Sequence, residues 1–275
     1  PFYEHSTLLN KLKRPYLLAC GTSTWSVGTS KFTEMLFSTM NAISTAIQND
    51  ALGVILTDWG DFGHLQYPIY AYPGIIYAGL AMWKYHGMNY HTIREELNSL
   101  VGVSEASLIL DISKYNLQED FYKSYSTKLF NPIIQAELCK TENVPIEAFT
   151  RRVKNLLLDK NELLFTKEYI SFLNKKLDTL NDSYIKEQLT SSILLLNTLC
   201  DVQDYLLDPT EERLDEIFSK FDQYLVIHKI LWIEENKEEG FEFSKSRIDN
   251  LKLSLSDYLN KQKEAQLWIR KNSLL

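Results

Sequence analysis

Two short, almost wholly apolar runs near the start of the chain predict buried β-strands. They are Pro15–Cys20, PYLLAC, and Gly53–Thr57, GVILT. Continuous apolar runs of this length suit strands that are covered on both faces, as in a parallel sheet. The residues between them, 31–50, predict a helix, because apolar side chains recur there at helical spacing: Met35, Leu36, Met40, Ile43 and Ile47. The order of strand, helix and strand predicts one βαβ unit.

A second β/α unit follows the first. After the second strand comes an aromatic loop, and then the strongly apolar run Gly74–His86, GIIYAGLAMWKYH, which predicts a helix. Two such units do not form a stable open sheet or a closed barrel by themselves. We therefore expect either that further strands precede Pro1 in the natural protein or that this segment packs against something else.

The rest of the chain predicts one helix after another. Helical periodicity covers Leu156–Leu173, Tyr184–Leu207, Glu211–Trp232 and Ser244–Trp268. Nine of the ten glycines lie at or before Gly102, so the composition changes near residues 88–103. We therefore predict an α/β part over residues 1–90 and an all-α helical domain over residues 91–275.

Charge and cysteine usage narrow the classes of partner. The formal net charge is −7 and no sustained Lys/Arg stripe is present, which argues against a nucleic-acid partner. Cys20, Cys139 and Cys200 lie far apart among apolar neighbours, so we interpret each as a small core residue. No apolar run reaches the length of a membrane-spanning helix, so no membrane span is expected.

No signal peptide is visible in the sequence, which favours a cytoplasmic location. The chain begins at Pro1 and not at Met, so we expect a truncated or processed N-terminus that would hide any targeting segment.

The candidate chemistry lies where the two predicted strands end, because working residues of parallel α/β folds gather at the carboxyl ends of strands. The first strand is followed by Gly21–Ser26, GTSTWS, and the second by Asp58–His64, DWGDFGH. A tryptophan beside two carboxylates on a glycine-containing loop suits a sugar site. The indole covers the apolar face of a pyranose, and the carboxylates accept hydrogen bonds from its hydroxyls. The candidate substrate-binding residues are Trp59, Asp61, Trp25, Asp58 and His64.

Other interpretations of the same residues stay open at this point. Trp59 and Trp25 could be core residues, Asp58 could cap a turn, and His64 could be a hydrogen-bonded structural residue. Asp58, Asp61 and His64 together form a loose metal-ligand pattern, and the two aspartates could serve as an acid/base pair. Ser23 is a poor nucleophile candidate, because no GxSxG turn and no base accompany it.

Three segments resemble the family 20 glycoside hydrolases, the β-N-acetylhexosaminidases, and more narrowly their bacterial subgroup with an additional C-terminal helical domain. They are Gly21–Trp25, GTSTW; Leu56–Gln66, LTDWGDFGHLQ; and Tyr72–Trp83, YPGIIYAGLAMW. Further along, Ile230–Leu251 is similar to the closing motif of that subgroup. Here Glu235-Asn236 stands where Arg-Asn is usual, and Glu239-Gly240 where Gly-Gly is usual.

The resemblance implies a TIM barrel whose last two β/α units lie in this chain, and removal of terminal β-linked N-acetylglucosamine or N-acetylgalactosamine. The mechanism is substrate-assisted, with the sugar's 2-acetamido oxygen attacking the anomeric carbon. The family's last strand ends in Trp-x-Glu, which Trp59-Gly60-Asp61 matches with Asp in place of Glu. By this resemblance Trp59 stacks on the terminal sugar and Asp61 accepts from its outer hydroxyls, while Trp25 is a lesser candidate for the pocket wall.

The family's catalytic Asp-Glu pair lies upstream of the Trp-x-Glu strand, and no such pair precedes Asp50 here. The sequence Asp-Glu occurs once, at Asp215-Glu216, within a predicted helix of the second half, and we reject it as the catalytic pair. We therefore expect the C-terminal part of a longer enzyme, inactive alone, with no cofactor and no metal.

The expected partners are glycans ending in N-acetylhexosamine, the missing N-terminal barrel part in the same or a separate chain, and a second copy bound through the helical domain. The alternatives are a non-catalytic carbohydrate-binding or scaffold protein, a helical interaction or dimerisation module, and an unrelated α/β enzyme.

Overall fold

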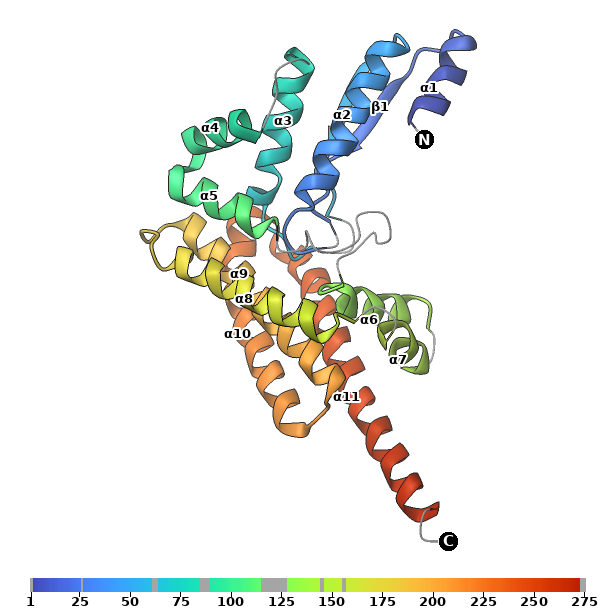
Figure 1. Cartoon of the computed structure of the whole chain (residues 1–275), viewed down its shortest axis with the longest axis vertical. Coiled ribbons are helices and arrows are strands. Elements are labelled where there is room, and N and C mark those ends of the chain that lie inside the picture. The colour runs from blue at the N-terminus through green and yellow to red at the C-terminus, as the bar shows by residue number, and fades with distance from the viewer. Residues whose placement is uncertain are drawn as a thin grey trace. The chain divides into compact units, whose positions relative to one another are not determined.

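In the residues that it describes, the computed structural model is mainly helical (Figure 1). It also contains a two-stranded parallel sheet. The chain divides into two compact units. Unit 1 comprises Pro1–Asp61, Leu65–Leu117 and Lys176–Leu189, and unit 2 comprises Phe62–His64, Gln118–Lys175 and Thr190–Leu275. The structure describes residues 2–25, 27–60, 64–84, 90–114, 128–143, 146–154 and 157–272. A mainly helical chain with a parallel strand pair was predicted and is confirmed, whereas membership of a larger barrel stays a prediction.

Unit 1 contains the βαβ unit that the apolar pattern predicts. Strands β1 (Leu17–Gly21) and β2 (Gly53–Thr57) pair in parallel, with Leu17 opposite Gly53 and Gly21 opposite Thr57. Helix α2 (Phe32–Gln48) connects them. The other helices of this unit are α1 (Phe2–Lys11), η1 (Pro68–Tyr70), α3 (Tyr72–Trp83), α4 (Tyr90–Val101) and α5 (Val103–Ile112). Unit 1 thus extends beyond the first 90 residues.

One face of the sheet is covered by α2, which lies along β1 (Figure 1). The centre of this contact is formed by Leu18 and Cys20 of the strand and by Ala42 and Ala46 of the helix, all buried. Small alanines let the helix axis approach the strands closely, and burial of the apolar surface stabilises the packing. This contact explains why the alternate residues of β1 are buried.

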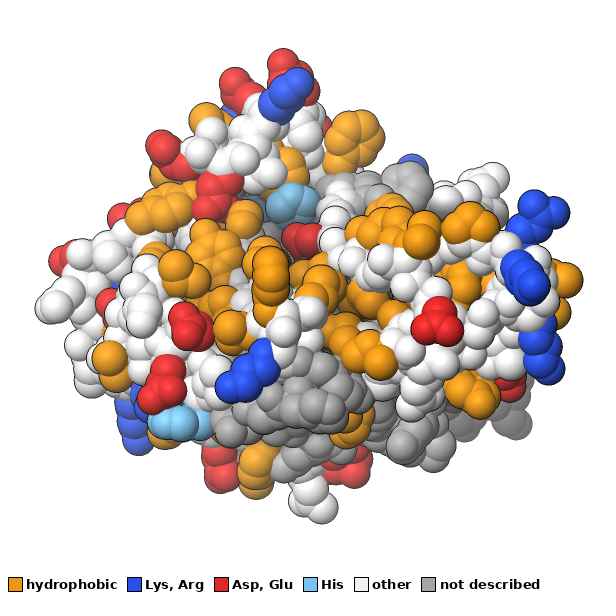
Figure 2. Space-filling model, turned by 90° about the horizontal axis from the view of Figure 1, so that it is seen from above, with side chains coloured by type: hydrophobic (Ala, Val, Ile, Leu, Met, Phe, Trp, Pro, Cys, Tyr) orange, Lys and Arg blue, Asp and Glu red, His pale blue; other side chains and the backbone are white. Residues whose placement is uncertain are grey.

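The opposite face of the sheet is exposed. Leu17 is 50% exposed, Ile55 on the neighbouring strand is 45% exposed, and Ala19, which lies opposite Ile55, is exposed as well. Hydrophobic side chains also gather in patches on the molecular surface in Figure 2. Parallel sheets are normally covered on both faces, so an exposed apolar face on such a pair marks a surface suited to further packing.

Unit 2 is built from helices of very different lengths. They are α6 (Asn131–Thr141), α7 (Ile146–Lys154), most of α8 (Lys160–Leu177), the greater part of α9 (Tyr184–Leu207), α10 (Glu211–Glu235), η2 (Glu238–Gly240) and α11 (Phe241–Asn272). The predicted limits of α9 are confirmed, and α8, α10 and α11 fall where helices were predicted, with ends shifted by a few residues.

Two buried tyrosines join α9 to α11. The hydroxyl of Tyr205 donates to the carbonyl of Leu255 at 2.8 Å, and the hydroxyl of Tyr258 donates to the carbonyl of Leu206 at 3.0 Å. The centroids of the two tyrosine rings lie 6.2 Å apart. Burial raises the pKa of Tyr205. These paired hydrogen bonds fix the register of the two helices, because each buried hydroxyl needs its partner.

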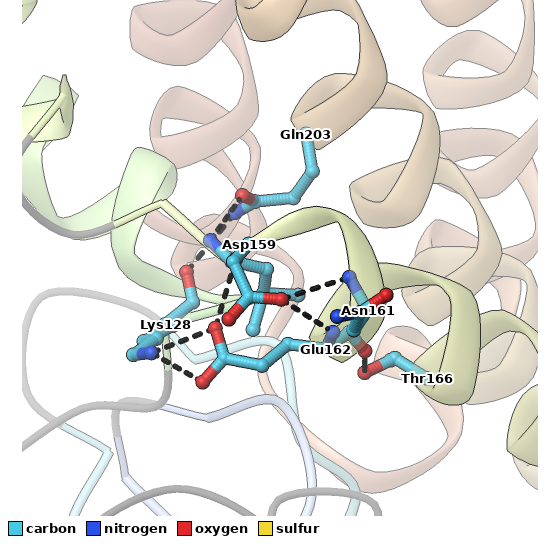
Figure 3. A network of polar contacts seen from close by, with 7 residues as sticks. Lys128, Asp159, Asn161, Glu162, Thr166 and Gln203 are labelled. Atoms are coloured by element: carbon cyan, nitrogen blue, oxygen red, sulfur yellow. Dashed lines mark hydrogen bonds and ion pairs between the residues drawn. The ribbon is translucent and has the colours of Figure 1, made fainter.

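A polar network closes the first turn of α8 (Figure 3). Asp159 accepts from the backbone N–H groups of Asn161 and Glu162 at 2.8 and 2.9 Å, and Glu162 accepts from the N–H of Asp159 at 2.8 Å. This reciprocal arrangement is a capping box, which satisfies N–H groups that a helix leaves unpaired at its start. Lys128 binds both carboxylate oxygens of Glu162, at 2.6 and 2.8 Å.

Gln203 of α9 ties this network to the helical core (Figure 3). Its side-chain carbonyl accepts from the N–H of Leu158 at 3.1 Å, and its amide donates to the carbonyl of Lys128 at 3.1 Å. Gln203 is fully buried. A single side chain therefore satisfies two backbone groups from segments that are distant in sequence.

Replacement of Gln203 by Leu should lower the free energy of unfolding by about 2 kcal/mol, because two backbone groups lose their partner at nearly constant volume. Urea unfolding followed by far-UV circular dichroism measures the change. Gln223→Leu, at an exposed position of α10, is the matched control. Equal midpoints for the two variants would contradict a structural role for the network.

The three cysteines are buried, as the sequence predicted for core residues. Burial raises the pKa of each thiol, and it raises the pKa of Cys200 to about 12. These thiols therefore stay protonated and unreactive at neutral pH. Within the described ranges, no helix is long and apolar enough to cross a membrane.

Candidate functional site

The carboxyl ends of β1 and β2 bring three of the predicted site residues into one region of unit 1. Because the strands are parallel and in register, the residues after Gly21 and after Thr57 leave the sheet side by side. The N–H of Thr22 donates to the carbonyl of Thr57 at 3.0 Å and extends the pairing by one step. Asp58 and Trp59 follow Thr57 directly, and Trp25 lies a few residues after Thr22.

Asp58 is held by two threonines of the β1 loop. The hydroxyls of Thr22 and Thr24 both donate to its Oδ1 atom, the second at 2.7 Å. Both threonines are buried, whereas Asp58 is exposed. Between them Ser23 has a φ of 55°, in the left-handed region. That conformation reverses the chain, so that both hydroxyls reach one carboxylate. The arrangement orients Asp58 and leaves its second oxygen available as an acceptor.

Trp59 stands at the end of β2 and is 50% exposed. Its indole Nε1–H donates to Oγ1 of Thr57 at 2.9 Å, and its carbonyl accepts from the side-chain amide of Gln66 at 3.3 Å. The interpretation of Trp59 as a core tryptophan does not fit this exposure. An exposed indole with its polar edge already bonded presents its apolar face, which is the part that stacks on sugars.

Trp25 is half-buried and lies against Gly21. An ideal Cβ atom at residue 21 would lie 2.8 Å from Cζ3 of Trp25, so a side chain there would displace the indole. The same position lies 3.3 Å from Oγ1 of Thr57. Gly21 is therefore required by close approach, and Trp25 and Trp59 both lie near Thr57.

The two tryptophans share the sheet face that α2 leaves uncovered. Side chains alternate along a strand, so Gly21 and Thr57 face the same side as Ala19 and Ile55. That side is exposed at Ala19 and Ile55, whereas Gly21 is buried. The indoles therefore border an open surface at the carboxyl end of the strands, where ligands of parallel α/β folds bind.

His64 belongs to unit 2 and has a structural environment there. The backbone carbonyl of His64 accepts a hydrogen bond from the hydroxyl of Ser244. The centroid of its ring lies 4.6 Å from the centroid of the Trp232 ring. Nε2 of His228 lies 2.9 Å from the hydroxyl oxygen of Ser244. Burial, assisted by the nearby His64, lowers the pKa of His228 to about 3, so this imidazole is neutral. These contacts support the structural interpretation of His64.

Asp61 lies outside the described residues. The metal pattern and the acid/base pair that the sequence left open both include Asp61, so both stay predictions. Among the residues that the structure does describe, no group of three or more His, Cys, Asp or Glu side chains could hold a metal ion. Asp215 and Glu216 are exposed on α10.

Sequence reasoning missed the residues that orient the candidates: Thr22, Thr24 and Thr57 around the aspartate and the indole, and His228, Trp232 and Ser244 around His64. The sequence did contain a signal for Thr57. Thr57 lies two positions before Trp59, and residues at that spacing in an extended chain face the same side. The hydrogen bonds of Thr22 and Thr24 depend on the left-handed Ser23, which no pattern in the sequence predicted.

Comparison with known proteins adds no relative. No protein-family model matches the chain, and no curated protein matches it. The likeness to the family 20 glycoside hydrolases therefore remains a hypothesis that depends on the motifs and on the site geometry.

Proposed function

We propose that the carboxyl edge of the β1–β2 pair binds the terminal sugar in the C-terminal part of an exo-β-N-acetylhexosaminidase. Trp59 stacks on the apolar face of the sugar ring, and Trp25 forms a second wall. Asp58 and Asp61 accept hydrogen bonds from the hydroxyls. The observation that carries the proposal is the half-exposed Trp59, whose indole N–H is already bonded, beside an exposed, oriented carboxylate.

The uncovered sheet face supports the second part of the proposal, a missing partner. Leu17 and Ile55 expose about half of their surface on a parallel strand pair, a situation that further β/α units would relieve. Those units, in the same protein or in another chain, would supply the Asp-Glu pair. The acid would protonate the leaving oxygen, and the sugar's own acetamido oxygen would attack the anomeric carbon. This chain would bind and orient the sugar.

Binding of methyl N-acetyl-β-D-glucosaminide to this chain tests the proposal. Replacement of Trp59 by Ala should weaken binding by about tenfold, because a stacking contact of roughly 1 kcal/mol or more is lost. Chemical-shift titration in NMR spectra measures the dissociation constant even where it is millimolar.

Trp83→Ala is the matched control, since Trp83 is a 94% exposed tryptophan on α3 of the same unit. We expect this variant to bind like the parent chain. Absence of binding by the parent chain, or equal binding by the Trp59 variant, would refute the proposed function.

A further inference from the structure

We propose that Thr57 is a positioning residue, whose hydroxyl sets the orientation of the Trp59 indole at the ligand-binding edge. The inference rests on the proposed function, in which the face of that indole receives a pyranose ring. Thr57 lies in β2, two positions before Trp59. It acts through the indole and is not itself required to touch the ligand.

The hydrogen-bond directions at Thr57 are determined by its neighbours. Its hydroxyl donates to the carbonyl of Cys20 on the adjacent strand at 2.9 Å. A hydroxyl has a single hydrogen, so the remaining lone pairs must serve the indole N–H of Trp59, also at 2.9 Å. The backbone of β1 thus fixes the Thr57 hydroxyl, and the hydroxyl fixes the indole edge.

This link matters because Trp59 lacks the packing that holds a buried ring. Half of its surface is exposed. A side chain that must be immobilised on binding costs conformational entropy, and a side chain held in its bound orientation beforehand does not. The hydrogen bond to Thr57 therefore increases affinity without adding any contact to the sugar.

The same hydroxyl lies beside the second tryptophan. The space that a Cβ atom of Gly21 would fill lies 3.3 Å from Oγ1 of Thr57 and 2.8 Å from Cζ3 of Trp25. Trp25 and Trp59 are thus arranged around Thr57 and Gly21 on the uncovered face. Two apolar indoles beside an exposed carboxylate suit a ligand with one apolar face and a hydroxylated rim, which is a pyranose.

The test compares Thr57→Val, which removes the hydroxyl at nearly constant shape, with Thr57→Ser, which retains it. Thr198→Val is the matched control, because Thr198 donates to a backbone carbonyl within α9 and lies far along the chain from any tryptophan of the site. Two readouts are collected on each full-length variant. The first is the indole N–H resonance of Trp59, assigned by its loss in Trp59→Ala; the second is the dissociation constant for methyl N-acetyl-β-D-glucosaminide.

In Thr57→Val the Trp59 indole resonance should shift and its hydrogen should exchange faster with water, while affinity falls by about fivefold, the equivalent of one lost hydrogen bond. Thr57→Ser and Thr198→Val should match the parent chain in both readouts. An unchanged indole resonance in Thr57→Val would overturn the inference, as would a shifted resonance with unchanged affinity.

Failure of the proposed function gives a different result. If the parent chain does not bind the glycoside, the proposed function and the ligand role of Thr57 both fall, whatever the indole resonance does. If the parent chain binds and Trp59→Ala does not, a Thr57→Val variant that binds normally overturns the inference alone. Thermal unfolding of each variant separates these outcomes from loss of the fold.

Discussion

Acidification from pH 7 to pH 4 should lower the free energy of unfolding by about 3 kcal/mol through His228 alone. The folded-state pKa of this imidazole is about 3, below its ordinary value of 6.5. Between these two values the unfolded chain binds a proton that the folded chain does not. The stabilisation is therefore complete above pH 6.5 and is lost progressively as the pH falls toward 3.

The contacts of His228 explain the low pKa. Ser244 uses its hydrogen to donate to the His64 carbonyl, so Nε2 of His228 carries the hydrogen that Ser244 accepts. The ring of His228 stacks on that of Tyr224, with their centroids 5.1 Å apart, and its centroid lies 5.8 Å from that of Trp232. His228 is 1% exposed. A second proton would place a charge among these rings, where little solvation is available.

Urea unfolding at a series of pH values, compared between the parent chain and His228→Gln, isolates this effect. Glutamine can donate to Ser244 but does not titrate in this range. The variant should therefore lose much less stability between pH 7 and pH 4. His91→Gln is the matched control, since His91 is exposed on α4. Parallel stability curves for all three proteins would show that His228 is not the responsible group.

Replacement of Trp232 by Ala should lower the free energy of unfolding by about 4 kcal/mol, within the range for a large buried aromatic side chain. Trp232 is 5% exposed, and its Nε1–H donates to the carbonyl of Lys237 at 2.8 Å. Its ring contacts those of His64 and Phe241. Truncation creates a cavity and removes the surface on which the His64 ring lies.

Thermal and urea unfolding measure the loss, and Trp83→Ala provides the exposed control with the same change in composition. Trp232→Phe should lose less stability than Trp232→Ala, because it retains an aromatic ring in the same place. A loss below 1 kcal/mol in Trp232→Ala, on the order of a surface substitution, would show that the aromatic cluster is not part of the stabilising core.

The sequence predicted the fold best where periodicity was long or apolar runs were continuous. β1, β2, α2 and α9 are found where the pattern placed them. The helices that were not predicted are α1, α4, α5, α6 and α7, none longer than 12 residues. Helices of this length are marginally stable by themselves, and their helical state depends on tertiary packing that a sequence does not display.

The site was predicted in its residue types and only partly in its arrangement. Trp25, Asp58 and Trp59 gather at the strand ends because parallel strands carry their carboxyl ends to one edge. The position of His64 in unit 2 could not be predicted, because its partners Trp232 and Ser244 lie more than 160 residues further along the chain. Contacts of that sequence separation are set by the packing of α10 and α11 and not by local pattern.

The two-stranded sheet has a consequence for the behaviour of the protein in solution. In the described part of the chain the sheet ends at β1 on one side and at β2 on the other, and neither strand carries a charged residue. Charged side chains and prolines are the usual protection of a strand edge against pairing with another chain. Strands without these features lack that protection against pairing with a strand of another chain. A partner that covers these edges would therefore also act as a solubilising subunit.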